Sequence, residues 1–258
     1  IVGNYFGSIA LATVGFAAPV TQFYSFLSYI FVLGTQVLVS QQLGKGNLPM
    51  VCKVLTSGMV AAVSCGTLLW AFCQIFLNTL CGWLCSSSEC LPLLQQYLNG
   101  FSWGYPLGFL FLVSVPLLQL DNDKKRAFWA TFAMMVGCVS FNLLNVFYLH
   151  LGMLGVGLAY PCGCILASLV IITHFCNNKY VFKFKIALLN VGSVLKVIAQ
   201  GVPSSSFYIF NFVRAFVLNH YLFETGGNVA VAALVVANTV SVMVSVVAIP
   251  RGITNTLQ

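Results

Sequence analysis

Residues 154–176 read LGVGLAYPCGCILASLVIITHFC and contain no Asp, Glu, Lys or Arg. A run of about 20 apolar residues is what an α-helix needs to cross the ~30 Å hydrocarbon layer of a bilayer. Six further stretches share this length and apolar character: 14–40, 54–80, 93–118, 127–149, 198–222 and 228–250. The pattern predicts an all-α integral membrane protein, a bundle with seven spans.

The composition excludes a soluble domain. Of the 258 residues, 60% are hydrophobic and 6% are charged, whereas a soluble domain carries roughly 25% charged residues. A disordered chain would need low hydrophobicity and high charge. A membrane barrel would alternate polar and apolar residues in segments of ~10 residues, and the runs at 60–63 and 242–247 do not alternate. Lipid is therefore the expected solvent for most of the surface.

Lys and Arg residues are concentrated in every second gap between the apolar stretches. Ten of the eleven Lys and Arg residues fall in or beside every second gap between apolar stretches: Lys45 and Lys53; Lys124, Lys125 and Arg126; Lys179, Lys183, Lys185 and Lys196; and Arg251. The other gaps, near 79–92, 149–153 and 223–228, contain none. Cytoplasmic loops of membrane proteins carry the excess of Lys and Arg. The alternation predicts that the basic gaps are cytoplasmic and that the neutral gaps, with residues 1–8, lie outside. We interpret the net charge of +7 as topology and not as a nucleic-acid patch.

An internal repeat indicates two related lobes. Five positions recur at a constant offset of 220: Gly7, Ala10, Ala12, Ala17 and Val20 are matched by Gly227, Ala230, Ala232, Ala237 and Val240. Six predicted spans separate the copies, so both copies enter the membrane from the same side. Parallel repeats of this kind occur in several transporter folds. The repeat predicts that residues 10–40 and 230–258 are equivalent helices in two lobes.

The boundary between the lobes is expected at residues 177–197. This segment mixes Lys179, Lys183 and Lys185 with aromatic residues, as amphipathic segments at a membrane surface do. We therefore divide the chain into a first lobe (1–176), a cytoplasmic amphipathic linker (177–197) and the start of a second lobe (198–258).

Four segments resemble the multidrug and toxic compound extrusion (MATE) family. Residues 34–47 read GTQVLVSQQLGKGN, similar to the pattern that closes the family's second helix. Residues 119–127 are similar to its cytoplasmic turn after the fourth helix, 152–159 to the entry of its sixth helix, and 201–203 to the start of its seventh. The resemblance implies a twelve-helix protein with two six-helix lobes. This chain would then be a fragment holding helices two to eight, with only the first lobe nearly complete.

The resemblance implies a secondary antiporter that exports amphipathic or cationic organic compounds in exchange for H⁺ or Na⁺ by alternating access. The coupling residues of the family do not carry over cleanly. The family's fifth helix has Asn followed by Asp, where this chain has Asn142 and Asn145. Some family members carry Glu in the seventh helix, where this chain has Asn211. The acidic residues of the chain all fall in gaps: Glu89, Asp121, Asp123 and Glu224.

Polar side chains recur on single faces of three predicted spans. At 3.6 residues per turn, Gln200, Ser204, Asn211 and Arg214 share one arc. Asn238, Ser241 and Ser245 form a second stripe, and Thr21, Ser25, Ser28 and Gln36 a third. Such stripes serve interhelical hydrogen bonding or line a cavity. The candidate residues for a substrate or ion cleft are Gln22, Gln36, Asn142, Asn145, Gln200, Asn211, Arg214 and Asn238. We expect most of the aromatic residues to face lipid.

Arg214 is the one cation within a predicted span. A cation near the bilayer centre is costly, so such residues usually face a bundle interior or water. The alternative is snorkelling, in which the long side chain carries its charge to the interface. We favour the cleft.

No pattern points to an enzyme. The sequence lacks a phosphate-binding loop, a His-Glu-x-x-His motif and paired carboxylates within a span, and the ten cysteines show no metal-ligand spacing. We therefore expect no cofactor beyond the coupling ion. Cys81, Cys85 and Cys90 share one outer gap, which leaves a disulfide open.

Two other functions remain compatible with the residues. A lipid-linked saccharide flippase of the same superfamily would have a more cationic cleft, which Arg214 favours. A seven-helix receptor fits the span count, although the repeat argues against it. For the antiporter we expect a monomer in the plasma membrane, in the bacterial inner membrane, with small organic substrates and the bilayer as partners and no nucleic acid.

Overall fold

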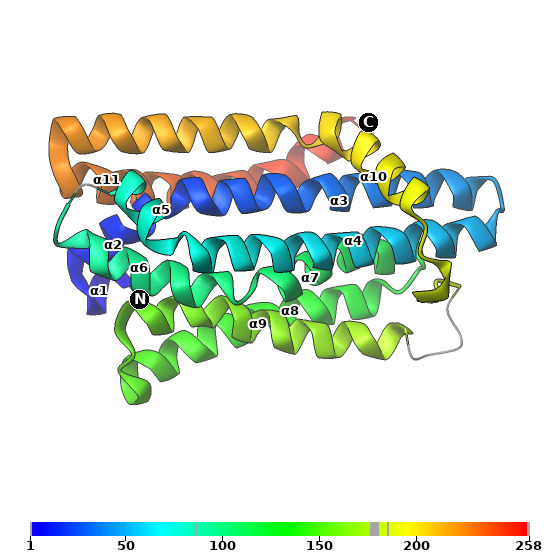
Figure 1. Ribbon diagram of the computed structural model, residues 1–258, viewed down its shortest axis with the longest axis horizontal. Coiled ribbons are helices and arrows are strands. Elements are labelled where there is room, and N and C mark those ends of the chain that lie inside the picture. Colours follow the sequence, from blue (N-terminus) through cyan, green and yellow to red (C-terminus); the bar gives the residue numbers. More distant parts are fainter. Residues whose placement is uncertain (1, 86, 176–180, 185, 257–258) are drawn as a thin grey trace.

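The computed structural model describes residues 2–85, 87–175, 181–184 and 186–256, and this part of the chain is helical with no strand. The α-helices are α1 (Val2–Tyr5), α2 (Gly7–Phe16), α3 (Ala18–Gly44), α4 (Leu48–Ile75), α5 (Leu77–Leu84), α6 (Cys90–Ser102), α7 (Tyr105–Leu120), α8 (Lys124–Leu144), α9 (Gly152–Phe175), α10 (Val191–Ser204) and α11 (Ser206–Thr256). A π-helical turn, η1 (Asn145–Leu149), follows α8, and a 3-10 turn, η2 (Ile186–Leu188), precedes α10. The all-α prediction is confirmed (Figure 1).

Five helical segments of the described chain are long and apolar enough to cross a membrane: Gly7–Gly44, Leu48–Ile75, Lys124–Leu149, Gly152–Phe175 and Ser206–Ser241. A sixth span forms if α6 and α7, which meet at a bend of 52°, are counted together. The two spans predicted at 198–222 and 228–250 are divided differently in the structure. α10 ends at Ser204, and α11 contains the rest of both.

The chain reverses inside α11 at Gly227, which has φ 61° and ψ −153°. This region of backbone space is accessible essentially only to glycine. Gly7, its partner in the sequence repeat, also has a positive φ, of 82°. Each copy of the repeat therefore begins with a glycine that turns the chain into a helix.

The connections fall into two sets at opposite ends of the bundle (Figure 1). The α3–α4 turn, the α7–α8 turn and residues 181–184 lie at one end, where Asp121 accepts hydrogen bonds from the amides of Val181 and Phe182. The connections around α5, between α8 and α9, and at Gly227 lie at the other. These are the basic and the neutral gaps respectively, so the antiparallel order matches the charge alternation.

Polar residues of the basic gaps begin the helices that follow them. Side chains of Asn47, Asp123 and Asn190 accept hydrogen bonds from amides in the first turns of α4, α8 and α10. Such N-caps supply an acceptor for the otherwise free amides of a first helical turn. The sequence thus fixes where these three helices start.

A cluster of tyrosines forms the centre of the first lobe. Tyr24 of α3 stacks on Tyr105 of α7, with ring centroids 4.7 Å apart, and its hydroxyl lies 2.7 Å from that of Tyr160 on α9. Tyr24 and Tyr105 are buried, so they are exceptions to the expectation that most aromatic residues face lipid. Buried tyrosine hydroxyls usually find a hydrogen-bond partner, and those of Tyr24 and Tyr160 satisfy each other. Gly108 makes room for them, because a Cβ there would overlap both hydroxyl oxygens.

The outer gap holds three cysteines as free thiols. Cys81, Cys85 and Cys90 are at most 3% exposed and pack in one apolar cluster with Phe16 and Leu94. The disulfide that the sequence left open is not formed. Burial raises the pKa of Cys85 to about 11 and that of Cys81 to about 12, so both thiols stay protonated near neutral pH.

The tyrosine cluster predicts that Gly108→Ala lowers stability. The added methyl group must displace both hydroxyls, at a cost of about 1–3 kcal/mol. The measurement is the thermal unfolding midpoint of the purified protein in detergent. The matched control is Gly82→Ala, since a Cβ at Gly82 meets nothing within 4 Å. Equal midpoints for the two variants would contradict the packing argument.

The buried thiols and the charge alternation together predict a labelling pattern. An impermeant maleimide applied outside intact cells at pH 7.5 should leave Cys81 and Cys85 unmodified, because their raised pKa values keep the reactive thiolate scarce. A cysteine replacing the exposed Ser88 should react quickly, and one replacing Lys125 should react only after permeabilisation. Rapid outside labelling at position 125 would reverse the predicted topology.

Candidate functional site

The break between α2 and α3 follows from a proline. Proline has no amide proton, so Pro19 cannot donate to the carbonyl of Gly15 four residues earlier. The side-chain amide of Asn219, on α11, donates to that carbonyl instead, at 2.6 Å. Asn219 is 4% exposed. A carbonyl released inside a bilayer must find another donor, and here the donor comes from a helix 204 residues further along the chain.

Small and apolar side chains complete this contact, which we call the outer clasp (Gly15, Asn219, Val231 and Val235). A Cβ at Gly15 would lie 2.7 Å from a methyl of Val231 and 2.8 Å from one of Val235. Only glycine lets the second part of α11 approach α2 so closely. Beside the clasp, Phe16 packs edge-on against Phe223, with centroids 5.5 Å apart.

Aromatic pairs join α3 to the first part of α11 further along the bundle. Phe23 lies 5.5 Å from Phe212, and Tyr29 stacks on Tyr208 with centroids 4.0 Å apart and planes 10° apart. Offset stacking of this kind adds to the gain from burial alone. α3 and the first part of α11 are therefore in contact through the middle of the span.

Two glycines form the contact nearest the basic end, which we call the inner glycine contact (Gly34, Gly201, Ile30 and Val197). A Cβ on Gly34 of α3 would overlap the carbonyl of Val197 on α10, and a Cβ on Gly201 of α10 would overlap the carbonyl of Ile30 on α3. Small residues allow membrane helices to approach backbone to backbone. α2 and α3 thus meet α10 and α11 at both ends and in the middle.

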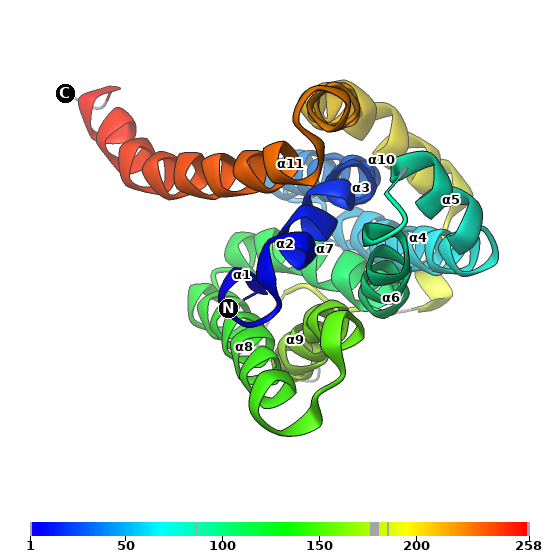
Figure 2. The ribbon, with the colours of Figure 1, turned by 90° about the vertical axis from the view of Figure 1, so that its left-hand side faces the viewer.

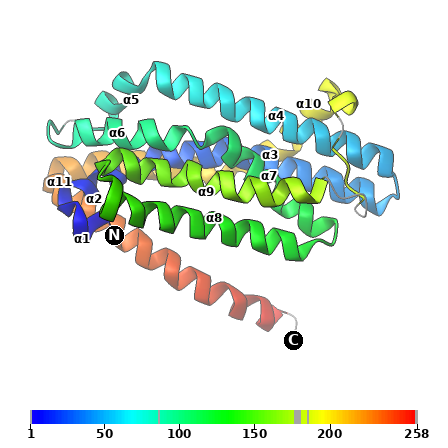
Figure 3. The ribbon, with the colours of Figure 1, turned by 90° about the horizontal axis from the view of Figure 1, so that it is seen from below.

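The second part of α11 touches the bundle only near the neutral end. Figures 2 and 3 show it leaving the other helices as it continues from Gly227 towards the C-terminus. In the Ser206–Ser241 segment 11% of the most apolar window is buried, against 50% for α9. α11 therefore carries a large uncovered face.

The structure divides the predicted cleft residues between three places. Gln22 and Gln36 are half-buried on α3. Each is seven residues from Tyr29, and this interval returns to the same helix face. They consequently flank the Tyr29–Tyr208 stack. Gln200 is exposed on α10, and the stripe predicted from it to Arg214 crosses the break between α10 and α11 at Ser205.

Asn211, Arg214 and Asn238 lie on α11. The amide of Asn211 donates to the carbonyl of Phe207 in its own helix, at 3.0 Å. Arg214 is exposed and has no acidic partner within 4 Å among the described residues. It lies two positions after Phe212, about 200° around the helix, so it points away from α3. Asn238 is exposed on the part of α11 that leaves the bundle.

Asn142 and Asn145 lie at the end of α8. Asn142 donates to the carbonyl of Cys138, one turn back, at 2.9 Å. Asn145 is fully buried: its side-chain oxygen accepts from the amide of Leu151 at 2.9 Å, and its nitrogen donates to the carbonyl of Gly152 at 3.0 Å. Both polar atoms of Asn145 therefore hold the connection to α9.

Asn219 was not among the predicted candidates. Two features of the sequence could have indicated it. Asn219 carries an isolated side-chain amide in an apolar run, and Pro19, in another span, leaves a carbonyl without its helical donor. Over the described residues no group of His, Cys, Asp or Glu could hold a metal ion. What the site offers is a helix interface with polar side chains on α3 and a free cation on α11.

Sequence and structure comparisons agree with this architecture. The MatE family model matches residues 1–160, and no curated protein matches the chain. A structure of the inward-facing conformation of a multidrug resistance MATE family transporter of the MOP superfamily aligns with a TM-score of 0.85 at 18% identity, over 93% of this chain and 55% of that one.

Two other solved structures are similar. The MATE multidrug transporter DinF-BH aligns with a TM-score of 0.82 at 16% identity, over 92% of this chain and 53% of that one. A MOP superfamily transporter from Pyrococcus furiosus aligns with a TM-score of 0.78 at 18% identity, over 90% and 52%. The chain therefore spans about half the length of these proteins.

Proposed function

Because the chain belongs to the MATE family, whose sequence model covers residues 1–160, we propose that the protein containing it is a secondary antiporter. It exports amphipathic, often cationic, organic compounds in exchange for H⁺ or Na⁺. We place it in the plasma membrane as a monomer. A family of transporters gives no support to a seven-helix receptor or to an enzyme.

The observation that carries this proposal is the interface of α2 and α3 with α10 and α11. Alternating access requires two bodies whose contact can open on either side of a bound substrate, and in repeat transporters substrates bind between the repeats. The outer clasp and the inner glycine contact close the two ends of this interface. We propose that these two contacts open in turn during transport.

The polar side chains beside the interface suit a mixed polar and apolar substrate. Gln22 and Gln36 can donate and accept hydrogen bonds, and the aromatic pair of Tyr29 and Tyr208 between them provides a flat surface. Ligand sites are generally apolar with a few polar groups that fix orientation. We propose that a substrate separates the Tyr29–Tyr208 stack when it binds.

Ion coupling requires a titratable or coordinating group. The four acidic residues of this chain lie at helix ends or in connections, so the middle of the described spans offers no carboxylate. We propose that the coupling carboxylate lies in the part of the relatives' length that this chain does not span. Arg214, on the face of α11 turned away from α3, would then be its partner or the group that a bound anion neutralises.

One observation favours a second function. Arg214 of α11 is exposed and has no acidic partner among the described residues. A flippase for anionic lipid-linked saccharides would need such a cation. Reconstituted protein decides between the two. Efflux of a fluorescent organic cation driven by an ion gradient supports the antiporter, and translocation of a lipid-linked diphosphate saccharide without efflux supports the flippase.

Arg214→Gln is predicted to impair transport. Loss of the charge should lower ion-driven efflux at least fivefold while membrane insertion, judged by the amount and monodispersity of purified protein, is unchanged. Arg214→Lys, which keeps the charge, should retain more activity than Arg214→Gln. The control is His220→Gln on the same helix, whose side chain is 72% exposed. Wild-type efflux by both Arg214→Gln and Arg214→Leu would mean that Arg214 only snorkels.

Asn219→Ala is predicted to open the outer side. A buried hydrogen bond lost in this way costs about 1–2 kcal/mol, which is roughly a 5–30-fold change in an equilibrium. The readout is the rate at which an impermeant maleimide, added outside, modifies a cysteine replacing Gln22 in a cysteine-free background. Asn211→Ala is the control, because its amide bonds only within its own helix. If both variants are labelled at the parental rate, the outer clasp does not hold the closed state.

A further inference from the structure

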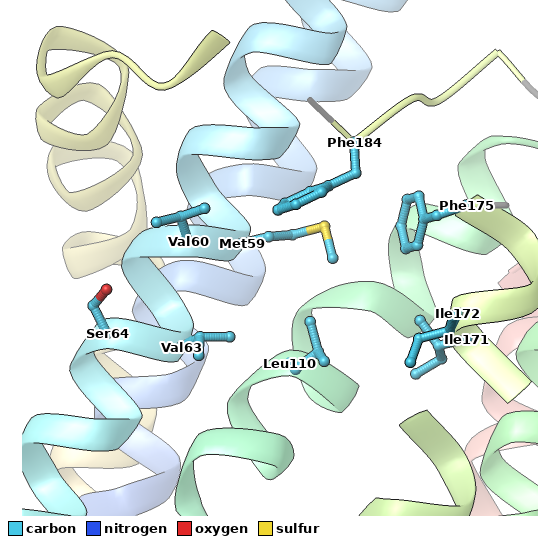
Figure 4. A pocket seen from close by; sticks show the side chains of 9 residues that line it. All are labelled: Met59, Val60, Val63, Ser64, Leu110, Ile171, Ile172, Phe175 and Phe184. Carbon is cyan, nitrogen blue, oxygen red and sulfur yellow. The ribbon is translucent and has the colours of Figure 1, made fainter. Parts of the chain in front are cut away.

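A groove of about 560 Å³ lies on the first lobe, away from the lobe interface (Figure 4). Its floor is Leu110 of α7 and its walls are Met59 and Val63 of α4 and Ile172 and Phe175 of α9, while Phe184 covers the basic end. Ser64 is the one polar lining residue. Ile172 is 51% exposed, so the groove opens sideways from the bundle at the level of two membrane spans.

The packing of α7 creates this groove. A Cβ at Gly66 of α4 would lie 2.9 Å from the carbonyl of Tyr105 and 3.0 Å from the ring of Phe109, so the glycine lets α7 approach α4 closely. Phe109, Val113 and Leu117 of α7 are buried. α4 and α9 extend further towards the surface than α7 does, so they form the two sides of the groove and α7 forms its base.

The cover is held in place by buried polar contacts. Asp121 accepts from the amide of Phe182 at 2.9 Å and from that of Val181 at 3.3 Å. The ring of His174, which is fully buried, lies 3.2 Å from Asp121 and 2.8 Å from Asp123. The segment 181–184 is thereby fixed to the α7–α8 turn and to the end of α9.

The side chains of this segment have different surroundings. Phe182 is 2% exposed in the core and Phe184 lines the groove, whereas Lys183 between them is exposed. Lys53 on α4 lies seven residues before Val60, on the same face, about 10 Å nearer the basic end. Two cations therefore flank the covered end of the groove.

We propose that the groove binds one acyl chain of an anionic phospholipid from the cytoplasmic leaflet, with Lys53 and Lys183 facing its phosphate. An apolar groove at membrane depth favours a hydrocarbon chain. Cations at the interface attract anionic lipid headgroups, and the predicted topology puts both lysines on the cytoplasmic side. A bound chain would fill the space between α4 and α9 and hold Phe184 over it.

A further helix fits this groove less well than a lipid chain. Its volume lies within the roughly 300–1,000 Å³ of small-molecule sites, whereas a helix with its side chains is about 10–12 Å across. The faces that await protein partners lie elsewhere: the apolar windows of α8 and α11 are 11% buried, and those of α4 and α9 are 50% buried. This proposal requires that the protein is inserted in a membrane, but it does not depend on the proposed transport function.

The test uses the protein in nanodiscs containing a phosphatidylglycerol with a diazirine in one acyl chain. Irradiation and peptide mapping should place most adducts on residues 59–64, 171–175 and 184. Photoreactive phosphatidylcholine at the same mole fraction should label these residues at least threefold less. A spread of adducts over all exposed apolar faces, or equal labelling by both lipids, would overturn the proposal.

Point variants test the acyl-chain groove and the two lysines separately. Val63→Phe should fill the groove and lower its labelling at least fivefold, whereas Ile75→Phe, at a 75% exposed position of the same helix, should not. Lys53→Gln with Lys183→Gln should abolish the preference for phosphatidylglycerol, whereas Lys45→Gln should preserve it. The proposal fails if Val63→Phe labels like its control, or if a photoreactive organic cation displaces the lipid and labels the same residues.

Discussion

Hydrocarbon offers no hydrogen-bond donor, so a carbonyl that a proline leaves without its helical partner needs another one. Pro19, at the start of α3, leaves the carbonyl of Gly15 without its usual amide partner, and Asn219 donates to it from α11. A contact that would be minor in water is obligatory in a bilayer. This contact helps to fix α11 against α2, because Gly15 also sets how near Val231 and Val235 can come.

Tyrosines hold the helices of the first lobe together, and glycines set the close approach of helices at the lobe interface. The Tyr24, Tyr105 and Tyr160 cluster lies inside the first lobe, where stacking and a shared hydroxyl contact hold three helices together. At the lobe interface, Gly34 and Gly201 bring α3 and α10 together backbone to backbone, and Val197 of α10 packs in the same apolar core as Phe31 and Val32 of α3. The glycines therefore set how closely the two helices approach.

The sequence predicts the class of fold and the order of its helices because length, hydropathy and charge alternation act locally. It could not predict what depends on distant partners. Asn145 looked like a cleft residue, and the structure uses both its polar atoms in a connection. The sequence could not identify which tyrosines are buried, since ring composition does not reveal which side of a helix is covered. Asn219 escaped notice because its partner is a carbonyl that only the Pro19 break makes available, and the position of Arg214 away from α3 depends on the break at Ser205.

The residue type at the Gly227 turn is restricted, although no neighbouring atom restricts it. A Cβ at this position, or at Gly7, would meet nothing within 4 Å, so sterics with the rest of the molecule would permit any residue there. The restriction comes from handedness. With φ 61° and ψ −153°, an L-amino acid would clash with its own backbone, while a D-amino acid would fit. The reversal in α11 therefore requires glycine because of the handedness of L-amino acids, and not because of the size of the side chains around it.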